Sequence, residues 1–306
     1  MTNHDLLIIG GGPAGLAAGL YAARARLSVL LIEKEMVGGQ MATTELIENY
    51  PGFSEGSSGV ELAEKMREQA ERFGLRIELD EVMSVDFTRP EMAVTLGDGE
   101  RTGRAAIIAT GRRPQLLGVP GEIELRGRGV SYCATCDGPF FRDKRIVVVG
   151  GGNSAIEEAL YLSRFASEVV VVHRRDKLRA DRVLQERSFN NKKMRFVWDS
   201  VVTSIEGDGK VEALAVRNVK TGKTASIATD GVFVYVGNLP NTEVFKDEIE
   251  LDERGYVIVD PELATSARGV FAAGDVRVGP AKQVATAVGD GALAVISAER
   301  YLENVQ

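Results

Sequence analysis

The sequence predicts an α/β protein built on two copies of one strand, turn, helix and strand unit. Residues 5–34 and 145–174 align without a gap, at an offset of 140 positions. In each copy a short apolar strand leads into a GGG turn, an Ala-rich or Leu-rich helix and a second apolar strand. This is the βαβ unit that binds dinucleotides. Its repetition predicts two Rossmann-like dinucleotide-binding domains.

The two glycine-rich turns have the spacing that phosphate binding requires. The first contains Gly10, Gly12 and Gly15, and the second contains Gly150, Gly152 and Ala155. The first glycine permits a tight turn, the second lets backbone amides approach a pyrophosphate, and the third small residue lets helix pack on strand. The helix N-terminus adds a partial positive charge toward the phosphates. We therefore expect one nucleotide pyrophosphate at each turn.

The residues that end the second strand of each copy differ in charge, and they predict different nucleotides. Glu33 ends the first copy, where a carboxylate accepts hydrogen bonds from ribose hydroxyls. His173, Arg174 and Arg175 end the second copy, and Arg179 follows. A guanidinium matches phosphate oxygens and keeps its charge, which suits a 2′-phosphate. We expect FAD or NAD at the first turn and NADP at the second, although a solvated basic surface is the alternative for the arginines.

Two segments rich in Pro and Gly predict that the chain crosses twice between the domains. They are Gly111 to Pro120 and Gly237 to Asn241. Two crossings mean that one domain is inserted into the other. The expected organisation is a first dinucleotide-binding domain in two parts, at 1–114 and 241–306, and a second dinucleotide-binding domain with the C-x-x-C pair at 115–240. The strand before Asp275 places an acid at its tip, suited to a flavin's ribityl hydroxyls.

Composition limits the classes of function. The chain has 306 residues, 44% hydrophobic content and a formal net charge of −7. This acidic balance argues against nucleic acid as a partner, since phosphate binding requires a basic face. No stretch approaches the roughly 20 apolar residues of a membrane span. The N-terminus lacks the pattern of a signal peptide, so we expect a cytoplasmic protein without a membrane partner.

The only two cysteines, Cys133 and Cys136, form a C-x-x-C pair that is followed by Asp137. A zinc site requires about four ligands, and His4 and His173 are the only histidines, so no metal is expected. Two cysteines packed in a core are the other alternative. The C-x-x-C spacing favours a redox pair, because a lowered thiol pKa and easy disulfide closure coincide there. Asp137 is then a nearby proton carrier.

With these features placed, the chain resembles low-molecular-weight bacterial thioredoxin reductases along essentially its whole length. The matching stretches are GGGPAGLAA, GGQ at 38–40, ENYPG at 48–52, CATCDG at 133–138, GGGNSAIEEALYL, HRRDKLRA at 173–180 and FAAGDV at 271–276. The resemblance implies a homodimer with FAD and NADPH sites and a redox-active disulfide in the NADPH domain. It implies electron transfer from NADPH through FAD to the Cys133–Cys136 disulfide and on to thioredoxin.

The resemblance also implies roles for individual residues. The implied FAD contacts are Gly10, Gly12, Pro13, Ala14, Gly15, Glu33, Gly39, Gln40, Asn49, Thr110, Gly111, Asp275 and Gln283. The implied NADPH contacts are Gly152, Asn153, Ser154, His173, Arg174, Arg175 and Arg179. Arg128 and Phe140 match positions that grip thioredoxin. Cys136 is implied to lie nearer the flavin, which leaves Cys133 as the attacking thiol and Asp137 as the proton shuttle.

One departure from the family and three alternative functions stay open. The family has an aromatic-Arg-Gln run before its last helix, where this chain has Ala281, Lys282 and Gln283. A lysine keeps the charge but loses the planar fork. The alternatives are a reductase of another disulfide partner, such as a glutaredoxin-like protein or a peroxidase component, a dithiol oxidase that uses oxygen, and a redox sensor that is not an enzyme.

Overall fold

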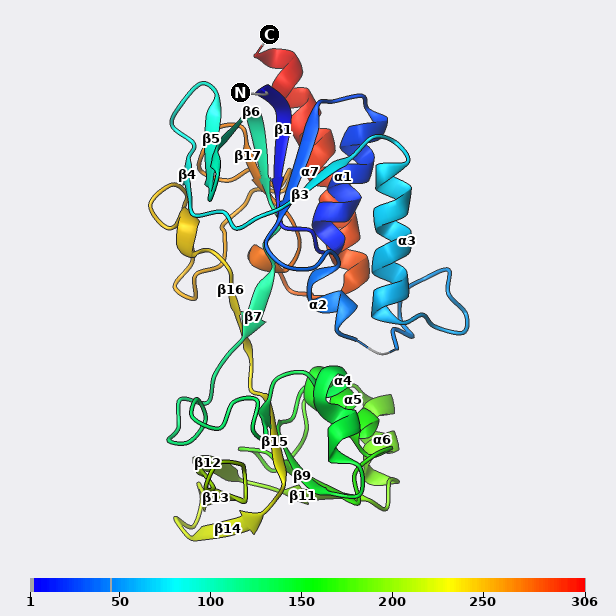
Figure 1. Cartoon of the computed structure of the whole chain (residues 1–306), viewed down its shortest axis with the longest axis vertical. Coiled ribbons are helices and arrows are strands. Elements are labelled where there is room, and N and C mark those ends of the chain that lie inside the picture. Colours follow the sequence, from blue (N-terminus) through cyan, green and yellow to red (C-terminus); the bar gives the residue numbers. More distant parts are fainter. Residues whose placement is uncertain (1–2, 45, 306) are drawn as a thin grey trace. The chain divides into compact units, whose positions relative to one another are not determined.

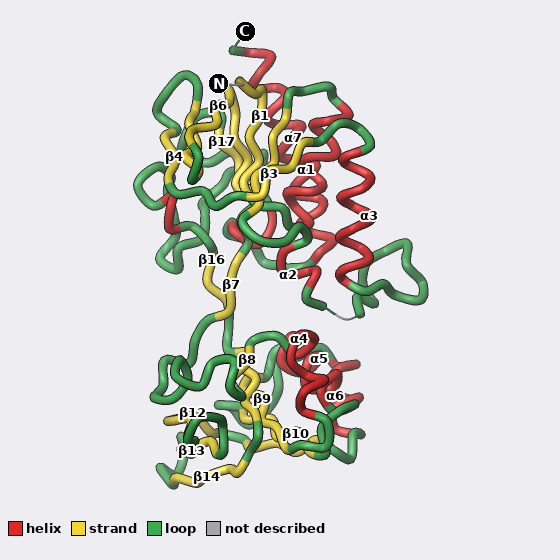
Figure 2. The backbone as a smooth tube through the Cα atoms, viewed as in Figure 1, coloured by secondary structure: helices red, strands yellow, loops and turns green. Residues whose placement is uncertain are grey.

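The computed structural model of the chain describes residues 3–44 and 46–305 and divides into two compact units. Met1–Arg113 and Leu239–Gln306 together form one, which we call the discontinuous unit. Pro114–Asn238 forms the other, the inserted unit. Figure 1 shows the elements of each unit, and Figure 2 shows their helices and strands by colour. No helix among the described residues is both long enough and apolar enough to cross a membrane.

The discontinuous unit is built on a seven-stranded sheet in the order β3-β2-β1-β6-β5-β4, with β17 also paired to β6. Strands β1, β2, β3, β6 and β17 run parallel, whereas β4 and β5 are antiparallel additions. The strands are β1 Asn3–Ile9, β2 Val29–Glu33, β3 Arg76–Leu79, β4 Ser84–Asp86, β5 Met92–Leu96, β6 Gly99–Ile108 and β17 Val270–Ala272.

Helices cover one face of this sheet. They are α1 Pro13–Arg24, α3 Gly59–Glu71 and α7 Val284–Asn304. The short helix α2 Gly39–Ala42 packs with α3. The 3-10 turn η2 Glu243–Phe245 lies on the opposite face of the sheet, and the 3-10 turn η3 Gly274–Val276 follows β17. Alternate side chains of a strand point to opposite faces. Leu6 and Ile8 of β1 therefore pack with α1 and α7, while Leu7 and Ile9 pack with β5 and Phe245 on the other face. Both faces of β1 are buried, as the unbroken apolar run predicts.

The inserted unit repeats the parallel sheet in the order β11-β10-β9-β15-β8. Its helices lie on one face of that sheet, and the antiparallel sheet β12-β13-β14 packs on the other. The strands are β8 Val130–Ser131, β9 Arg145–Gly150, β10 Glu168–Val172, β11 Met194–Val197, β12 Ser200–Glu206, β13 Ala213–Asn218, β14 Thr224–Ala228 and β15 Gly231–Tyr235. The helices are α4 Ala134–Asp137, α5 Asn153–Leu162 and α6 Arg182–Phe189, with the 3-10 turn η1 Gly138–Phe141.

The two segments between the units differ from independent flexible linkers. Arg112–Pro114 (β7) and Asn238–Pro240 (β16) pair with each other as a two-stranded ribbon. Each crossing is therefore shorter than the Pro/Gly-rich stretch in the sequence. Leu117 and Val119, from the first Pro/Gly-rich stretch, pack against the core of the inserted unit. Burial of their apolar surface stabilises this packing.

Candidate active site and nucleotide sites

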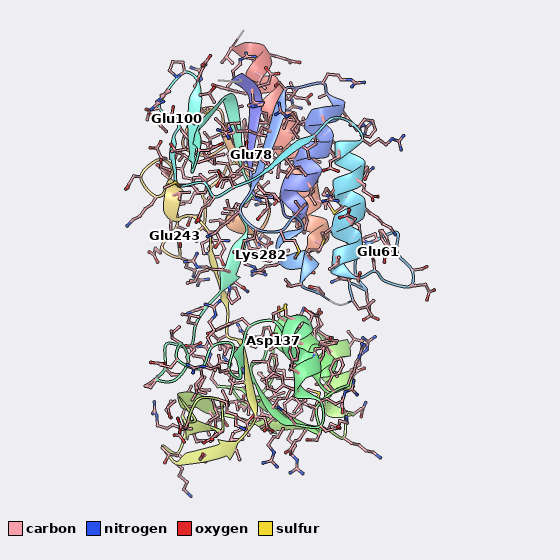
Figure 3. All side chains as sticks on the ribbon, in the orientation of Figure 1. Glu61, Glu78, Glu100, Asp137, Glu243 and Lys282 are labelled. Carbon is pink, nitrogen blue, oxygen red and sulfur yellow. A yellow bond between two sulfur atoms is a disulfide. The ribbon has the colours of Figure 1, made fainter. Side chains whose placement is uncertain are left out.

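The two cysteines form a disulfide at the surface of the inserted unit. Cys133 is the N-cap of the short helix α4, and Cys136 lies within it. Cys136 is exposed and Cys133 is half-buried. Asp137 ends α4 and is half-buried, and Figure 3 labels it beside this helix. The disulfide and an acid thus share one helical turn that solvent reaches.

Hydrogen bonds distinguish the two sulfur atoms. The amide of Cys136 donates to Sγ of Cys133 over 3.2 Å, and Oγ1 of Thr135 lies 3.3 Å from the same sulfur. The Ser131 hydroxyl accepts from the amide of Cys133 over 3.0 Å. A donor aimed at sulfur stabilises a thiolate more than a thiol. When the disulfide is reduced, this arrangement favours the thiolate on Cys133.

A buried carboxylate supports the strand that leads to the turn, and the motifs in the sequence did not indicate it. Glu122 is 1% exposed and accepts from the amides of Leu117 and Gly118 over 2.8 Å and 2.7 Å. It also accepts from the hydroxyl of Tyr132 over 2.8 Å. Three donors compensate for the burial of the charge. This group fixes Tyr132, the residue before Cys133.

The glycine loop of the inserted unit leaves open space at the start of α5. A side-chain carbon placed on Gly152 would meet no atom within 4 Å, and no side chain caps this helix. Gly150 has φ +153°, and a side-chain carbon there would lie 2.5 Å from the carbonyl oxygen of Tyr235. The first amides of a helix lack intrahelical partners. The loop therefore presents free donors to a space that a phosphate fits.

The polar residues expected at this loop lie next to it. The amide of Arg179 donates to the carbonyl of Gly151 over 2.7 Å, which ties the arginine segment to the glycine loop. Asn153 and Asp181 exchange two hydrogen bonds of 2.8 Å each. Ser154, one position into α5, is exposed. The structure therefore brings the glycine loop and the arginine segment into one site.

The basic residues after β10 separate into a buried histidine and exposed arginines. Arg174, Arg175 and Arg179 are exposed, and none forms an ion pair with a carboxylate in the described part of the chain. His173 is buried, and its ring packs where a side chain on Gly151 would be. Burial, followed by the charges of the three arginines, lowers the pKa of His173. Its Nε2 is buried and has no hydrogen-bond partner among the described residues.

The glycine loop of the discontinuous unit has the same construction. Gly10 has φ +108°, and Gly12 is the N-cap of α1, with open space around its missing side chain. Pro13 is the first residue of the helix, where its fixed φ is favourable, and Ala14 follows it. A side-chain carbon on Gly15 would lie 1.8 Å from the carbonyl oxygen of Gly10. This close packing accounts for glycine at the third position.

Other expected contact residues converge on this loop. The Glu33 carboxylate accepts from the amide of Gly11 over 2.6 Å. Side-chain carbons placed on Gly10, Gly39 and Gly274 would come within 2.9 Å of Thr110, 3.4 Å of Gly12 and 2.9 Å of Ala14, respectively. Segments from four parts of the chain thus surround the start of α1.

Ionic and polar contacts extend the same site. Asp275 pairs with Arg112 over 2.7 Å, and the side-chain amide of Gln40 donates to the carbonyl of Arg112. Burial raises the pKa of Asp275, while Arg112 acts in the opposite direction. Asn49 donates to the side chain of Gln283, the N-cap of α7, over 3.1 Å.

A pair of hydrogen bonds at the end of β6 involves Asn241, which no motif in the sequence indicated as a site residue. Thr110 and Asn241 exchange two hydrogen bonds, of 2.7 Å and 2.9 Å. Gly111, the next residue, has φ +63°, a conformation that glycine adopts without strain.

Lys282 stands where the family has an arginine, and it contacts neighbouring residues of the same unit. Its ammonium donates to the carbonyl of Arg277 and lies 5.0 Å from the ring centroid of Tyr256. Burial lowers the pKa of Lys282, and Asp275 opposes this effect. Figure 3 labels Lys282 in the discontinuous unit.

Two residues expected to contact a protein partner lie near the disulfide in the sequence and are open to solvent. The Phe140 side chain is 75% exposed, although a large apolar side chain is usually buried. Arg128 is exposed, and its guanidinium donates to the carbonyl of Glu124. Both belong to the inserted unit.

Comparison with known families decides the chain's membership. The model for "Pyridine nucleotide-disulphide oxidoreductase" matches residues 4–291. The chain belongs to this family. Curated thioredoxin reductases of Bacillus subtilis and Peptoclostridium acidaminophilum are 48% and 47% identical to it. The alignments cover 99% and 98% of this chain and 96% and 97% of those proteins, respectively.

Solved structures give the same result. The thioredoxin reductase of Lactococcus lactis matches with a TM-score of 0.96 and 45% identity, over 98% of this chain and 99% of that chain. The thioredoxin reductase of T. acidophilum matches with a TM-score of 0.94 and 38% identity, over the whole of both chains. The family resemblance and the predicted α/β fold with two dinucleotide-binding domains are therefore confirmed.

Proposed function

We propose that this chain is an NADPH-dependent thioredoxin reductase. Its electrons pass from NADPH through FAD to the Cys133–Cys136 disulfide and then to thioredoxin. The observation that carries the proposal is the surface disulfide in the same unit as an arginine-bearing dinucleotide loop, in a chain with a second dinucleotide loop. The match to thioredoxin reductases over nearly the whole chain supports it.

We assign FAD to the discontinuous unit and NADPH to the inserted unit. Open space at Gly12 and Gly152, next to uncapped helix starts, fits a pyrophosphate in both. Glu33 and Asp275 supply carboxylates for ribose and ribityl hydroxyls in the first site. Exposed arginines such as Arg174, which form no ion pair with a carboxylate of the described residues, supply positive charge for a 2′-phosphate in the second. When bound, NADPH supplies a hydride and FAD relays two electrons to the disulfide.

The chain's own cysteines then carry out thiol–disulfide exchange. After two-electron reduction the Cys133 thiolate attacks one sulfur of the thioredoxin disulfide, forming a mixed disulfide and releasing the partner's other sulfur as a thiolate. Cys136 attacks Sγ of Cys133, which reforms the Cys133–Cys136 bond and releases the second thioredoxin sulfur. Asp137 carries a proton to this departing sulfur, and solvent protonates the sulfur that was released first. The partner thus gains two electrons and two protons.

The partner and the assembly follow from the same proposal. Exposed Phe140 and Arg128 offer an apolar contact and a cation to a protein substrate. We propose that thioredoxin docks on them and that the enzyme acts as a homodimer. We also propose that it works in the cytoplasm. The cytoplasm is a reducing compartment, and a disulfide there is more often catalytic than structural.

Anaerobic titration of the purified protein tests the function. NADPH should bleach the flavin absorbance, and oxidised thioredoxin should restore it. In a Cys133→Ser control NADPH should still bleach the flavin, but thioredoxin should not restore it. Restoration by a glutaredoxin-like protein and not by thioredoxin would replace the partner, and restoration by oxygen alone at the same rate would indicate a dithiol oxidase.

A further inference from the structure

Tyr235 provides an unexpected hydrogen bond to the redox-active turn. This residue ends β15, and its hydroxyl accepts from the amide of Ala134 over 2.9 Å. Ala134 is the first residue of α4 and is 1% exposed. The first amides of a helix have no carbonyl partner within the helix. The phenol of Tyr235 supplies the partner that this buried amide requires.

Two other amides of the turn donate to atoms of Cys133. Cys136 donates to Sγ of Cys133 over 3.2 Å, and Asp137 donates to the carbonyl of Cys133 over 3.2 Å. Ala134 lies between these donors and Cys133 along the chain. A shift of the peptide plane at Ala134 therefore changes the aim of the Cys136 amide. Fixing Ala134 keeps that amide on the sulfur.

Tyr235 is itself held firmly. Its backbone is opposite Gly150 in the parallel ladder of β15 and β9, with its ring packed against the core of the inserted unit. The charged groups that act on its phenol are Glu158 of α5 and Asp137 of α4. Burial, followed by these two carboxylates, raises the pKa of Tyr235, so the hydroxyl keeps its proton and accepts as a neutral group.

We propose that Tyr235 is a positioning residue for the thiol chemistry, whose hydroxyl fixes the amide of Ala134 and thereby keeps the Cys136 amide aimed at the Cys133 sulfur. This inference rests on the proposed function, because it takes Cys133 as the attacking thiol. Loss of the hydroxyl weakens one hydrogen bond to the thiolate. The expected result is a rise of about one unit in the pKa of the Cys133 thiol, which is about tenfold less thiolate at a pH below that value.

The test measures thiol reactivity directly. In a Cys136→Ser protein Cys133 is the only cysteine, and its alkylation by iodoacetamide is followed as a function of pH. Adding Tyr235→Phe should raise the midpoint of this profile by about one unit. Tyr301→Phe is the control, because Tyr301 belongs to α7 of the discontinuous unit, where its ring packs on Phe271, and it is not part of the unit that carries the turn. The control should leave the midpoint unchanged.

Iodoacetamide requires no nucleotide and no protein partner, so the two proposals can fail separately. Absence of thioredoxin reduction would count against the function, whereas an unmoved midpoint in Tyr235→Phe would overturn the inference. A lowered midpoint would also overturn it, since the released Ala134 amide would then serve the thiolate itself. An equal rise in both tyrosine variants would show a nonspecific effect and would overturn it too.

A measurement on the unmodified protein keeps the inference testable if Tyr235→Phe fails to fold. Hydrogen exchange, resolved to single amides by peptide fragmentation, should show the Ala134 amide at least about tenfold slower than in an unstructured peptide. Exchange of this amide at the unprotected rate would mean that the bond to Tyr235 is not maintained in solution, and the inference would be wrong.

Discussion

The exposed arginines after β10 allow the preference for NADPH to be tested quantitatively. Arg174 forms no ion pair with a carboxylate in the described part of the chain, so it is free to bind a 2′-phosphate. A hydrogen bond between charged groups contributes about 1.5–3 kcal/mol. Arg174→Ala should therefore lower kcat/KM for NADPH by roughly 10- to 150-fold. NADH has no 2′-phosphate, so its kcat/KM should change little.

Steady-state kinetics with both nucleotides measure this effect, and a binding measurement separates it from catalysis. Inhibition by 2′,5′-ADP should weaken by a similar factor in Arg174→Ala. Arg217→Ala, which removes another exposed arginine of the inserted unit from β13, is the matched control and should change neither value. Surface substitutions alter stability by only about 0.5 kcal/mol, so unfolding should not confuse the result. An equal loss with NADPH and NADH, or equal efficiency in the unmodified enzyme, would refute the reasoning.

Three further predictions concern the cysteines, a histidine and a buried carboxylate. Cys136→Ser should trap thioredoxin that carries a single activated cysteine as a mixed disulfide on a non-reducing gel, whereas Cys133→Ser should not; the reverse pattern would exchange the roles of the two cysteines. Burial lowers the pKa of His173 from 6.5. Below about pH 6.5 the folded protein therefore binds fewer protons than the unfolded chain. The free energy of unfolding consequently falls as the pH drops through that value. The fall in Tm between about pH 7 and pH 5 should be smaller in His173→Gln, and an identical pH dependence would contradict this. Glu122→Gln places an NH2 group against backbone donors and should lower the free energy of unfolding by denaturant by about 2 kcal/mol. Tyr132→Phe removes one hydrogen bond to Glu122 and should lower it by about 1 kcal/mol. Similar losses in both variants would count against the three-donor arrangement.

Features encoded over short distances in the sequence could be predicted. The two βαβ copies form because each apolar strand, glycine turn and helix is specified by neighbouring residues. Gly12 and Gly152 accordingly begin α1 and α5 as N-caps. The C-x-x-C spacing likewise gives the Cys133–Cys136 disulfide, since the two residues lie on one helical turn.

Contacts between distant residues left no signal in the sequence. Ala134 and Tyr235 are separated by 101 positions, and Thr110 and Asn241 by 131. Whether such side chains meet depends on where each strand ends relative to its neighbours, and no local pattern encodes this. The strands β12, β13 and β14 were also not indicated, because half-polar strands on one side of a sheet resemble loops in composition.

The β7–β16 ribbon has a consequence for how this architecture can be assembled. Next to it, the amide of Gln115 donates to the carbonyl of Gly237 over 2.9 Å, so the two ends of the inserted unit are hydrogen-bonded neighbours. A segment whose ends lie next to each other can be removed from its host domain, or inserted into another domain, without a long linker between the two ends of the host chain. The disulfide and the arginine-bearing loop lie together inside that segment. Recombination at these two neighbouring crossings would therefore transfer the cysteine pair and the nucleotide loop together between proteins, and the host would need only a short turn to close the gap.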